Sequence, residues 1–127
     1  EYVYFAGWVE TELEMSNYLR AANVYVSTPL SDGTSASLLE AMACGLPVVV
    51  SDAPGSLEWV QDGTNGFVVP QKSTGMLANR LTELLKDPTR REEMGTYNVS
   101  LANERANWET NFDVLESVYD ELIGRHK

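Results

Sequence analysis

Positive charge is scarce in this 127-residue sequence, which has 9 lysine and arginine residues against 19 aspartate and glutamate residues. The formal net charge is −10, and no lysine or arginine occurs between Arg20 and Lys72. Nucleic acids and anionic membranes attract proteins mainly through basic side chains. The composition therefore argues against nucleic acid and against an anionic membrane as partners of this chain.

Cysteine and histidine are almost absent, since Cys44 and His126 are the only examples. A single cysteine cannot form an internal disulfide, and Cys44, in a predicted helix, is expected to be a small buried residue. His126 is expected to be part of the tail, and one histidine cannot complete a zinc site or a catalytic triad. We therefore expect no metal, no cofactor and a cytoplasmic location.

Long apolar runs and targeting segments are also missing. No run approaches the roughly 20 residues of a membrane helix, and the alternating glycines of dinucleotide-binding loops are absent. No signal peptide is present and the first residue is Glu1, so we expect an excised or processed piece of a longer chain. The length of residues 1–127 corresponds to one domain.

The most informative segment that is present runs from Ser31 to Asp52. A polar loop containing Gly33 leads into a predicted helix over residues 36–44, which Gly45 ends before the apolar strand Val48–Val50. Free backbone N–H groups at the start of a helix hold phosphate without basic side chains. The segment therefore predicts an anion site.

Apolar patterning predicts strands that alternate with helices, followed by helices alone. The predicted strands are Val3–Ala6, Val24–Ser27, Val48–Val50 and Phe67–Val69. The predicted helices are Thr11–Ala22, 36–44, 56–61, 74–86, one opened by Asp87 and Pro88, and 110–124. This order indicates an α/β fold with a Rossmann-like, doubly wound parallel sheet. Because four strands are few for that fold, we expect a partial domain that lacks its first strands, with residues 71–127 mainly helical.

Ligands of such sheets bind beyond the carboxyl ends of the strands. Three of these ends fall at Gly7–Trp8, at residues 27–29 and at residues 51–55, and the loop 31–36 belongs to the same rim. The predicted anion site therefore lies where the fold would bind a ligand.

Four blocks in register resemble the C-terminal, donor-binding domain of retaining group 1 (glycogen-synthase-like) glycosyltransferases, which have the GT-B fold. The blocks are Val3–Gly7, Asn23–Ser27, Leu38–Val49 and Glu58–Val69. The resemblance implies an enzyme that transfers a hexose from a nucleotide-diphosphate sugar to an acceptor with retention and without a metal. The absence of an Asp-x-Asp motif agrees with that metal-independent mode.

The resemblance also implies that part of the machinery lies elsewhere. The family's phosphate-binding Arg/Lys pair lies upstream, an N-terminal domain binds the acceptor, and the last helix crosses to that domain. We therefore expect this chain alone to bind a donor weakly or not at all and to be inactive. The sequence identifies neither the base, the sugar nor the acceptor.

The resemblance assigns roles to individual residues. Glu40 would bond the ribose hydroxyls, and Asp32, where the family has glutamate, would be the sugar-facing catalytic residue. The implied donor-binding residues are Gly33, Thr34, Ser35, Ala36, Ser37, Leu38 and Glu40. From spacing alone, Ser37 and Glu40 also fit a capping box, and the pair Asp32-Gly33 is a common turn.

Other features have structural interpretations. We expect Glu58 to cap or brace a loop at the head of a short helix, and Trp8, Trp59 and Trp108 to be packing residues. The glycosylation sequon at Asn98 is discounted because it falls in a predicted helix. Two other functions stay open: a non-catalytic nucleotide- or sugar-binding module, and a sugar-nucleotide epimerase of the same fold.

Overall fold

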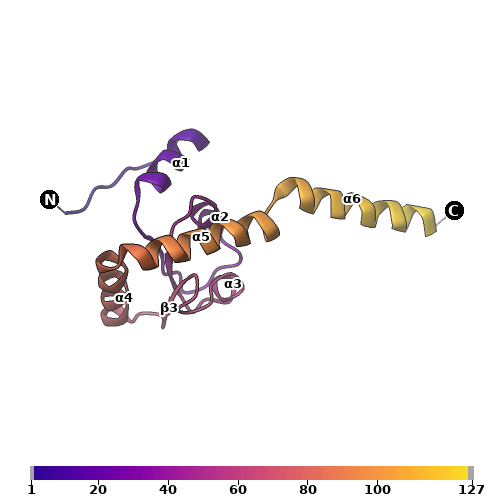
Figure 1. Cartoon of the computed structure of the whole chain (residues 1–127). Coiled ribbons are helices and arrows are strands. Elements are labelled where there is room, and N and C mark those ends of the chain that lie inside the picture. Colours follow the sequence, from indigo (N-terminus) through magenta and orange to yellow (C-terminus); the bar gives the residue numbers. More distant parts are fainter. Residues whose placement is uncertain (1, 126–127) are drawn as a thin grey trace.

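The computed structural model describes residues 2–125, so His126 lies outside the described residues. A small body contains the sheet, and the last helix extends away from it (Figure 1). The helices are α1 (Glu12–Ala21), α2 (Ala36–Ala43), α3 (Pro54–Leu57), α4 (Thr74–Lys86), α5 (Pro88–Arg105) and α6 (Trp108–Arg125). The strands are β1 (Tyr25–Ser27), β2 (Val48–Ser51) and β3 (Gly66–Val69).

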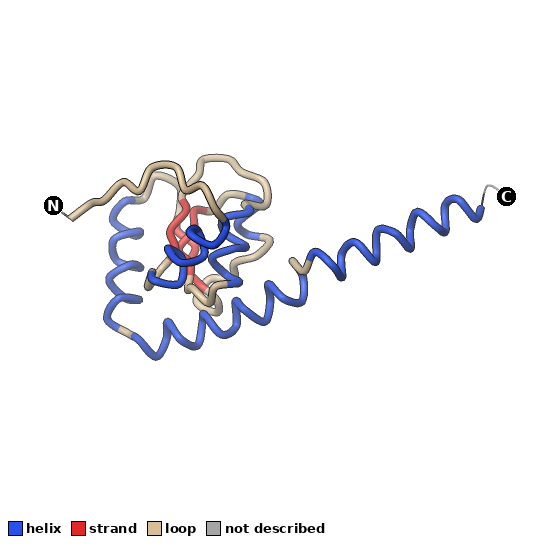
Figure 2. Tube along the Cα trace, turned by 90° about the horizontal axis from the view of Figure 1, so that it is seen from above, coloured by secondary structure: helices blue, strands red, loops and turns tan. Residues whose placement is uncertain are grey.

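The three strands form one parallel sheet in the order β1-β2-β3, with β2 in the centre. Figure 2 shows the strands in the middle of the body, with helices around them. All three valines of β2 are fully buried. Successive side chains of a strand point to opposite faces, so a strand without alternation must be covered on both. The predicted parallel, two-sided sheet is confirmed.

A separate apolar cluster covers each face of β2. The cluster built on α2 and the second half of α5 contains Leu38, Met42, Val48, Val50, Trp59, Val60 and Ala102. The cluster built on α4 and the first half of α5 contains Val49, Phe67, Val69, Leu84 and Met94. The long helix α5 therefore contributes to both faces and holds α2 and α4 together.

Local capping signals set several helix boundaries as predicted. The Thr11 hydroxyl accepts a hydrogen bond from the backbone N–H of Glu14 (3.2 Å), and the Asp87 carboxylate accepts one from Arg90 (2.9 Å). The helix predicted over residues 74–86 has those bounds. The helix predicted over residues 56–61 is wrong in position, because α3 begins at Pro54, a residue preorganised for the first helical position.

Gly45 ends α2 as its sequence position predicts. Its φ is +79°, a conformation that glycine adopts without steric cost. Its backbone N–H donates to the carbonyl of Met42 (3.0 Å), and that of Leu46 donates to the carbonyl of Ala41 (3.1 Å). These two bonds form a Schellman motif, which turns the chain from α2 directly into β2.

The strand predicted at Val3–Ala6 is wrong, because residues 2–10 have no regular secondary structure. A strand needs a neighbour to satisfy its backbone hydrogen bonds, and no described strand pairs with this segment, in which Phe5 is 89% exposed. Tyr4 of this segment interacts with Tyr18 of α1 and is the main cause that raises the pKa of Tyr18 above its ordinary value. The sheet of the described chain therefore has three strands, not four.

The helix α6 confirms the last predicted helix and begins two residues earlier, with the Asn107 side chain accepting from the N–H of Thr110 (3.1 Å). Every residue from Trp108 to Gly124 is exposed.

None of the helices within residues 2–125 combines the length and apolar composition needed to cross a membrane.

Three expectations about single residues have mixed outcomes. Trp59 is a buried packing residue as expected, whereas Trp8 and Trp108 are exposed, because neither the N-terminal segment nor α6 packs into the body. Cys44 is half-buried at the end of α2 and not fully buried as expected. Asn98 is fully buried, which agrees with discounting the sequon.

Candidate functional site

The loop before α2 is anchored at its start by the end of β2. The Ser51 hydroxyl donates a 2.6 Å hydrogen bond to the carbonyl of Pro29. Ser51 and Ser27 are the last residues of paired parallel strands, so both strands end beside this loop. The loop therefore lies at the carboxyl edge of the sheet, as predicted.

The middle of the loop rests on α3. A Cβ atom placed on Gly55 would overlap the carbonyl oxygen and carbon of Gly33. Only a residue without a side chain allows two backbone segments to approach so closely. Gly55 is therefore required by the packing of α3 against the loop, a role that the sequence reasoning missed.

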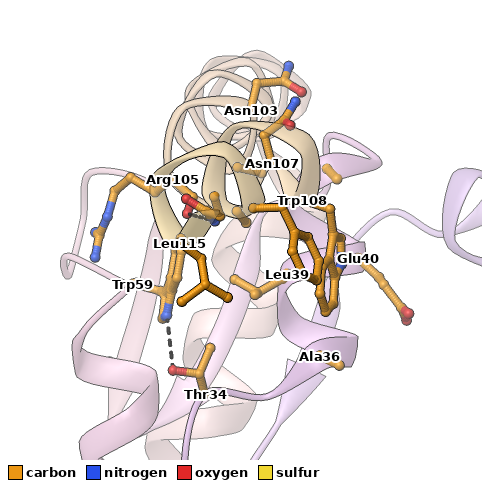
Figure 3. A pocket seen from close by; sticks show the side chains of 15 residues that line it. Thr34, Ala36, Leu39, Glu40, Trp59, Asn103, Arg105, Asn107, Trp108 and Leu115 are labelled. Carbon is orange, nitrogen blue, oxygen red and sulfur yellow. Dashed lines mark hydrogen bonds between the residues drawn. The ribbon is translucent and has the colours of Figure 1, made fainter. Parts of the chain in front are cut away.

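Thr34 joins the same loop to the residues that follow α3. The Trp59 indole Nε1–H donates to the Thr34 hydroxyl, and that hydroxyl donates to Oε2 of Glu58, both at 3.4 Å. The Trp59–Thr34 bond is drawn in Figure 3. Glu58 therefore braces the loop as expected, although it lies at the C-terminal end of α3 and not at the head of a helix.

Arg105, the last residue of α5, reaches these residues from a distant part of the sequence. Its Nη2 lies 3.7 Å from Oε1 of Glu58, and its guanidinium carbon lies 4.4 Å from the centre of the Trp59 ring. The stretch between Arg20 and Lys72 has no basic residue, so this positive charge comes to the loop through the fold. No pattern in the sequence pointed to Arg105.

The start of α2 presents backbone N–H groups to the loop side. Ser35 is the N-cap residue but its hydroxyl makes no capping bond; it lies 3.0 Å from the Ser37 hydroxyl, which in turn lies 2.7 Å from the Tyr25 hydroxyl. Within residues 2–125, the N–H groups of residues 33–37 donate to no other group. The amide of Leu38 donates to the Ser35 carbonyl (3.1 Å), so the row of free donors ends at Ser37.

Such a row of free donors is an anion-binding feature. The first N–H groups of a helix have no partner inside it, and the helix dipole adds a partial positive charge at that end. The amides of residues 33–35 extend the row from α2 into the loop. The arrangement can hold a diphosphate with few basic side chains.

The two acidic residues of interest are both exposed and form no hydrogen bond or ion pair within the described chain. Glu40 lies on α2, and Ser37 lies inside the helix and not at its N-cap, which is Ser35. The capping box considered for Ser37 and Glu40 is therefore not formed, and the Glu40 carboxylate is free to meet a ligand. Asp32 lies in the loop at the same rim.

A cavity of about 590 Å³ opens beside Glu40, between α2, the end of α5 and the start of α6. The Trp108 and Phe112 rings stack on one wall, with 5.2 Å between their centres. Figure 3 shows Leu39 and Leu115 inside the cavity and the Glu40 carboxylate directed away from them, toward its rim. Thr34 and Ala36 also line this cavity, so it borders the polar loop before α2.

Comparison with known proteins finds one family and several relatives that this chain resembles. The family described as "Glycosyl transferases group 1" matches residues 1–100. The D-inositol 3-phosphate glycosyltransferase of Thermobifida fusca is 31% identical over 110 residues, which cover 87% of this chain and 25% of that protein. The chain spans between 22% and 31% of the length of three curated relatives.

Solved structures match the fold as well. The C-terminal domain of a glycosyl transferase group 1 family protein from Francisella tularensis matches with a TM-score of 0.74 and 26% identity, over 82% of this chain and 53% of that one. Anabaena HepE in complex with UDP-glucose matches with a TM-score of 0.78 and 25% identity, over 84% of this chain and 30% of that one. The fold is therefore that of the C-terminal domain of a GT-B glycosyltransferase, as expected.

Proposed function

Because this chain belongs to the group 1 glycosyl transferase family, we propose that it forms the donor-binding part of a retaining, metal-independent hexosyltransferase. The observation that carries the proposal is the row of free N–H groups at residues 33–37, followed on α2 by the free carboxylate of Glu40. The donor would be a nucleotide-diphosphate sugar, the ligand class named for the similar HepE structure.

Each part of the donor meets a matching group in this proposal. The diphosphate lies on the amides of residues 33–37, and the two ribose hydroxyls donate to the Glu40 carboxylate. Asp32 lies beside the hexose. When the bond between the sugar C1 and the diphosphate oxygen breaks, the diphosphate keeps the electron pair, and preorganised amides stabilise its growing negative charge.

The energies indicate that this chain holds only part of the site. A helix N-terminus contributes roughly 0.3–1 kcal/mol to an anion, and up to about 2 kcal/mol in a buried geometry, whereas micromolar binding requires about 8 kcal/mol. Since Arg105 is engaged by Glu58 and Trp59, we propose that an Arg/Lys pair outside this chain supplies the missing positive charge. We expect the chain alone to bind donors weakly and to catalyse no transfer.

The proposal extends to the parts outside the chain. An N-terminal domain binds the acceptor, α6 crosses to that domain, and the exposed apolar side chains of α6, among them Phe112, Leu115 and Tyr119, pack against it. Any membrane contact belongs to that domain, and the whole enzyme works in the cytoplasm without a bound metal or cofactor.

The proposal is tested by titrating the chain with UDP-glucose and following its backbone amides by NMR. The resonances of residues 33–37 and 40 are expected to shift at millimolar concentrations of ligand. Replacing Glu40→Gln removes a charge-assisted hydrogen bond and should weaken binding by about 10-fold or more. Glu93→Gln, on the exposed side of α5, is the matched control and should leave binding unchanged. Shifts that avoid residues 33–40 would contradict the proposed site.

Turnover separates this proposal from the two alternatives, when the chain is assayed joined to its N-terminal domain. A transferase forms a glycoside with an acceptor and keeps the configuration at C1. A binding module retains the donor unchanged, and an epimerase interconverts nucleotide sugars or releases nucleotide without an acceptor. Resistance of the transfer reaction to EDTA tests metal independence.

A further inference from the structure

Arg105 makes three contacts with the two residues that follow α3, Glu58 and Trp59. One guanidinium nitrogen, Nη1, donates to the backbone carbonyl of Glu58 (3.2 Å), and Nη2 lies 3.7 Å from the Glu58 carboxylate. The guanidinium carbon also lies over the Trp59 ring, 4.4 Å from the ring centre. A planar guanidinium can make these three contacts at once, whereas a lysine ammonium cannot.

The two residues that Arg105 contacts, Glu58 and Trp59, both form hydrogen bonds with the Thr34 hydroxyl. Thr34 accepts from the Trp59 indole and donates to the Glu58 carboxylate. A hydroxyl that must accept from one group and donate to another has a single orientation. Thr34 is the second of the five residues 33–37 with free amides, so fixing its side chain also restricts the donors next to it.

The arrangement contributes little to the stability of the fold. The side chains of Arg105 and Glu58 are 41% and 57% exposed, and exposed ion pairs add little to the free energy of folding. Arg105 also contacts the last helix, because its backbone carbonyl accepts a hydrogen bond from the Asn111 side chain of α6 (3.1 Å). The contacts therefore run from the α5–α6 junction to the loop.

We propose that Arg105 is a positioning residue for the loop 31–36. Through Glu58 and Trp59 it holds Thr34, and thereby holds the amides of residues 33–37 in the arrangement that receives a diphosphate. The benefit to ligand binding rests on the proposed donor site. The effect on the loop itself does not, because it is present without any ligand.

The first experiment measures the loop in the free chain. Trp8→Phe and Trp108→Phe remove the two exposed tryptophans, so that the remaining fluorescence reports Trp59, and NMR reports the amides of residues 33–37. Arg105→Lys keeps the positive charge but loses the planar guanidinium. Thr34→Val keeps the shape of the side chain but loses the hydroxyl. Both should shift the Trp59 emission and the amide resonances, whereas Thr34→Ser should restore the original spectra.

The second experiment measures affinity for UDP-glucose in the same variants. Arg105→Lys and Thr34→Val should each weaken binding by about 3- to 10-fold, the effect of one ordinary hydrogen bond. Arg20→Lys, an exposed arginine on α1, is the control and should change neither the spectra nor the affinity. The melting temperature should be the same in all variants, which distinguishes positioning from general destabilisation.

The outcomes separate the two proposals. If UDP-glucose shifts resonances of the wild-type chain only outside residues 33–40 but the loop spectra still respond to Arg105→Lys, the donor site is wrong and the positioning role of Arg105 stands. If the spectra of residues 33–37 do not respond to Arg105→Lys, or if Thr34→Ser behaves like Thr34→Val, the positioning role is overturned. Equal affinity of wild type and Arg105→Lys also overturns it.

Discussion

Asn65 and Asn98 form a side-chain pair in the interior of the protein, with Nδ2 of Asn65 donating to Oδ1 of Asn98 at 2.8 Å. Nδ2 of Asn98 donates in turn to the carbonyls of Leu46 and Asn65, both at 2.8 Å. The pair therefore joins α5 to the turn before β3 and to the exit of α2. Since α2 presents the free amides and Glu40, this buried pair fixes the helix on which the candidate site is built.

We predict that Asn98→Ala destabilises the fold by about 2–4 kcal/mol. The substitution leaves the buried carbonyls of Leu46 and Asn65 without this donor, and each buried group without a partner costs about 1–3 kcal/mol. Urea unfolding measures the change. Asn103→Ala, at an exposed position of the same helix, should stay within about 0.5 kcal/mol of wild type. A loss for Asn98→Ala as small as that of the control would contradict the prediction.

Gly55→Ala should displace the loop from α3. The added Cβ would overlap the Gly33 carbonyl, and such overpacking typically costs about 1–3 kcal/mol. We expect a matching loss in the free energy of unfolding and weaker binding of UDP-glucose. Gly75→Ala is a close control, because Gly75 is likewise the second residue of its helix and a Cβ there meets open space. That control should be neutral or slightly stabilising.

Asp32 can be tested for a sugar-facing role through turnover in a protein that joins this chain to its N-terminal domain. Asp32→Asn removes the charge and should lower kcat by about 10-fold or more, the effect of losing a charge-assisted hydrogen bond. Asp32→Glu restores the residue of the family pattern and should retain activity. Neither change should alter stability, because Asp32 is exposed and has no partner within residues 2–125. Full activity of Asp32→Asn would rule out the role.

Removal of α6 should scarcely change the stability of the body. No residue from Trp108 to Gly124 is buried, so a chain that ends at Asn107 should unfold in urea within about 1 kcal/mol of the full chain, as expected for changes at exposed positions. The shortened chain should also associate less, because it loses the exposed Trp108, Phe112 and Leu115. A marked loss of stability would mean that α6 packs on the body in solution.

Local patterns determined much of the fold. The caps Thr11 and Asp87, the glycine stop at Gly45 and the unbroken valines of β2 each depend on neighbouring residues, and all agree with the structure. The loop 31–36 is predicted at the carboxyl edge of the sheet because it follows a strand, and ligands of such sheets bind beyond the carboxyl ends of the strands.

Only the tertiary structure decided the rest. Val3–Ala6 has the residues of a strand but no partner strand within the described chain, and pairing is a property of two segments. The sequence alone allows Glu40 either to form a capping box with Ser37 or to bind a ligand. The capping box is not formed, because the N-cap residue of α2 is Ser35. Arg105 reaches Glu58 across 47 positions of the sequence, and no local pattern encodes such a contact because chain folding, not chain order, sets that distance.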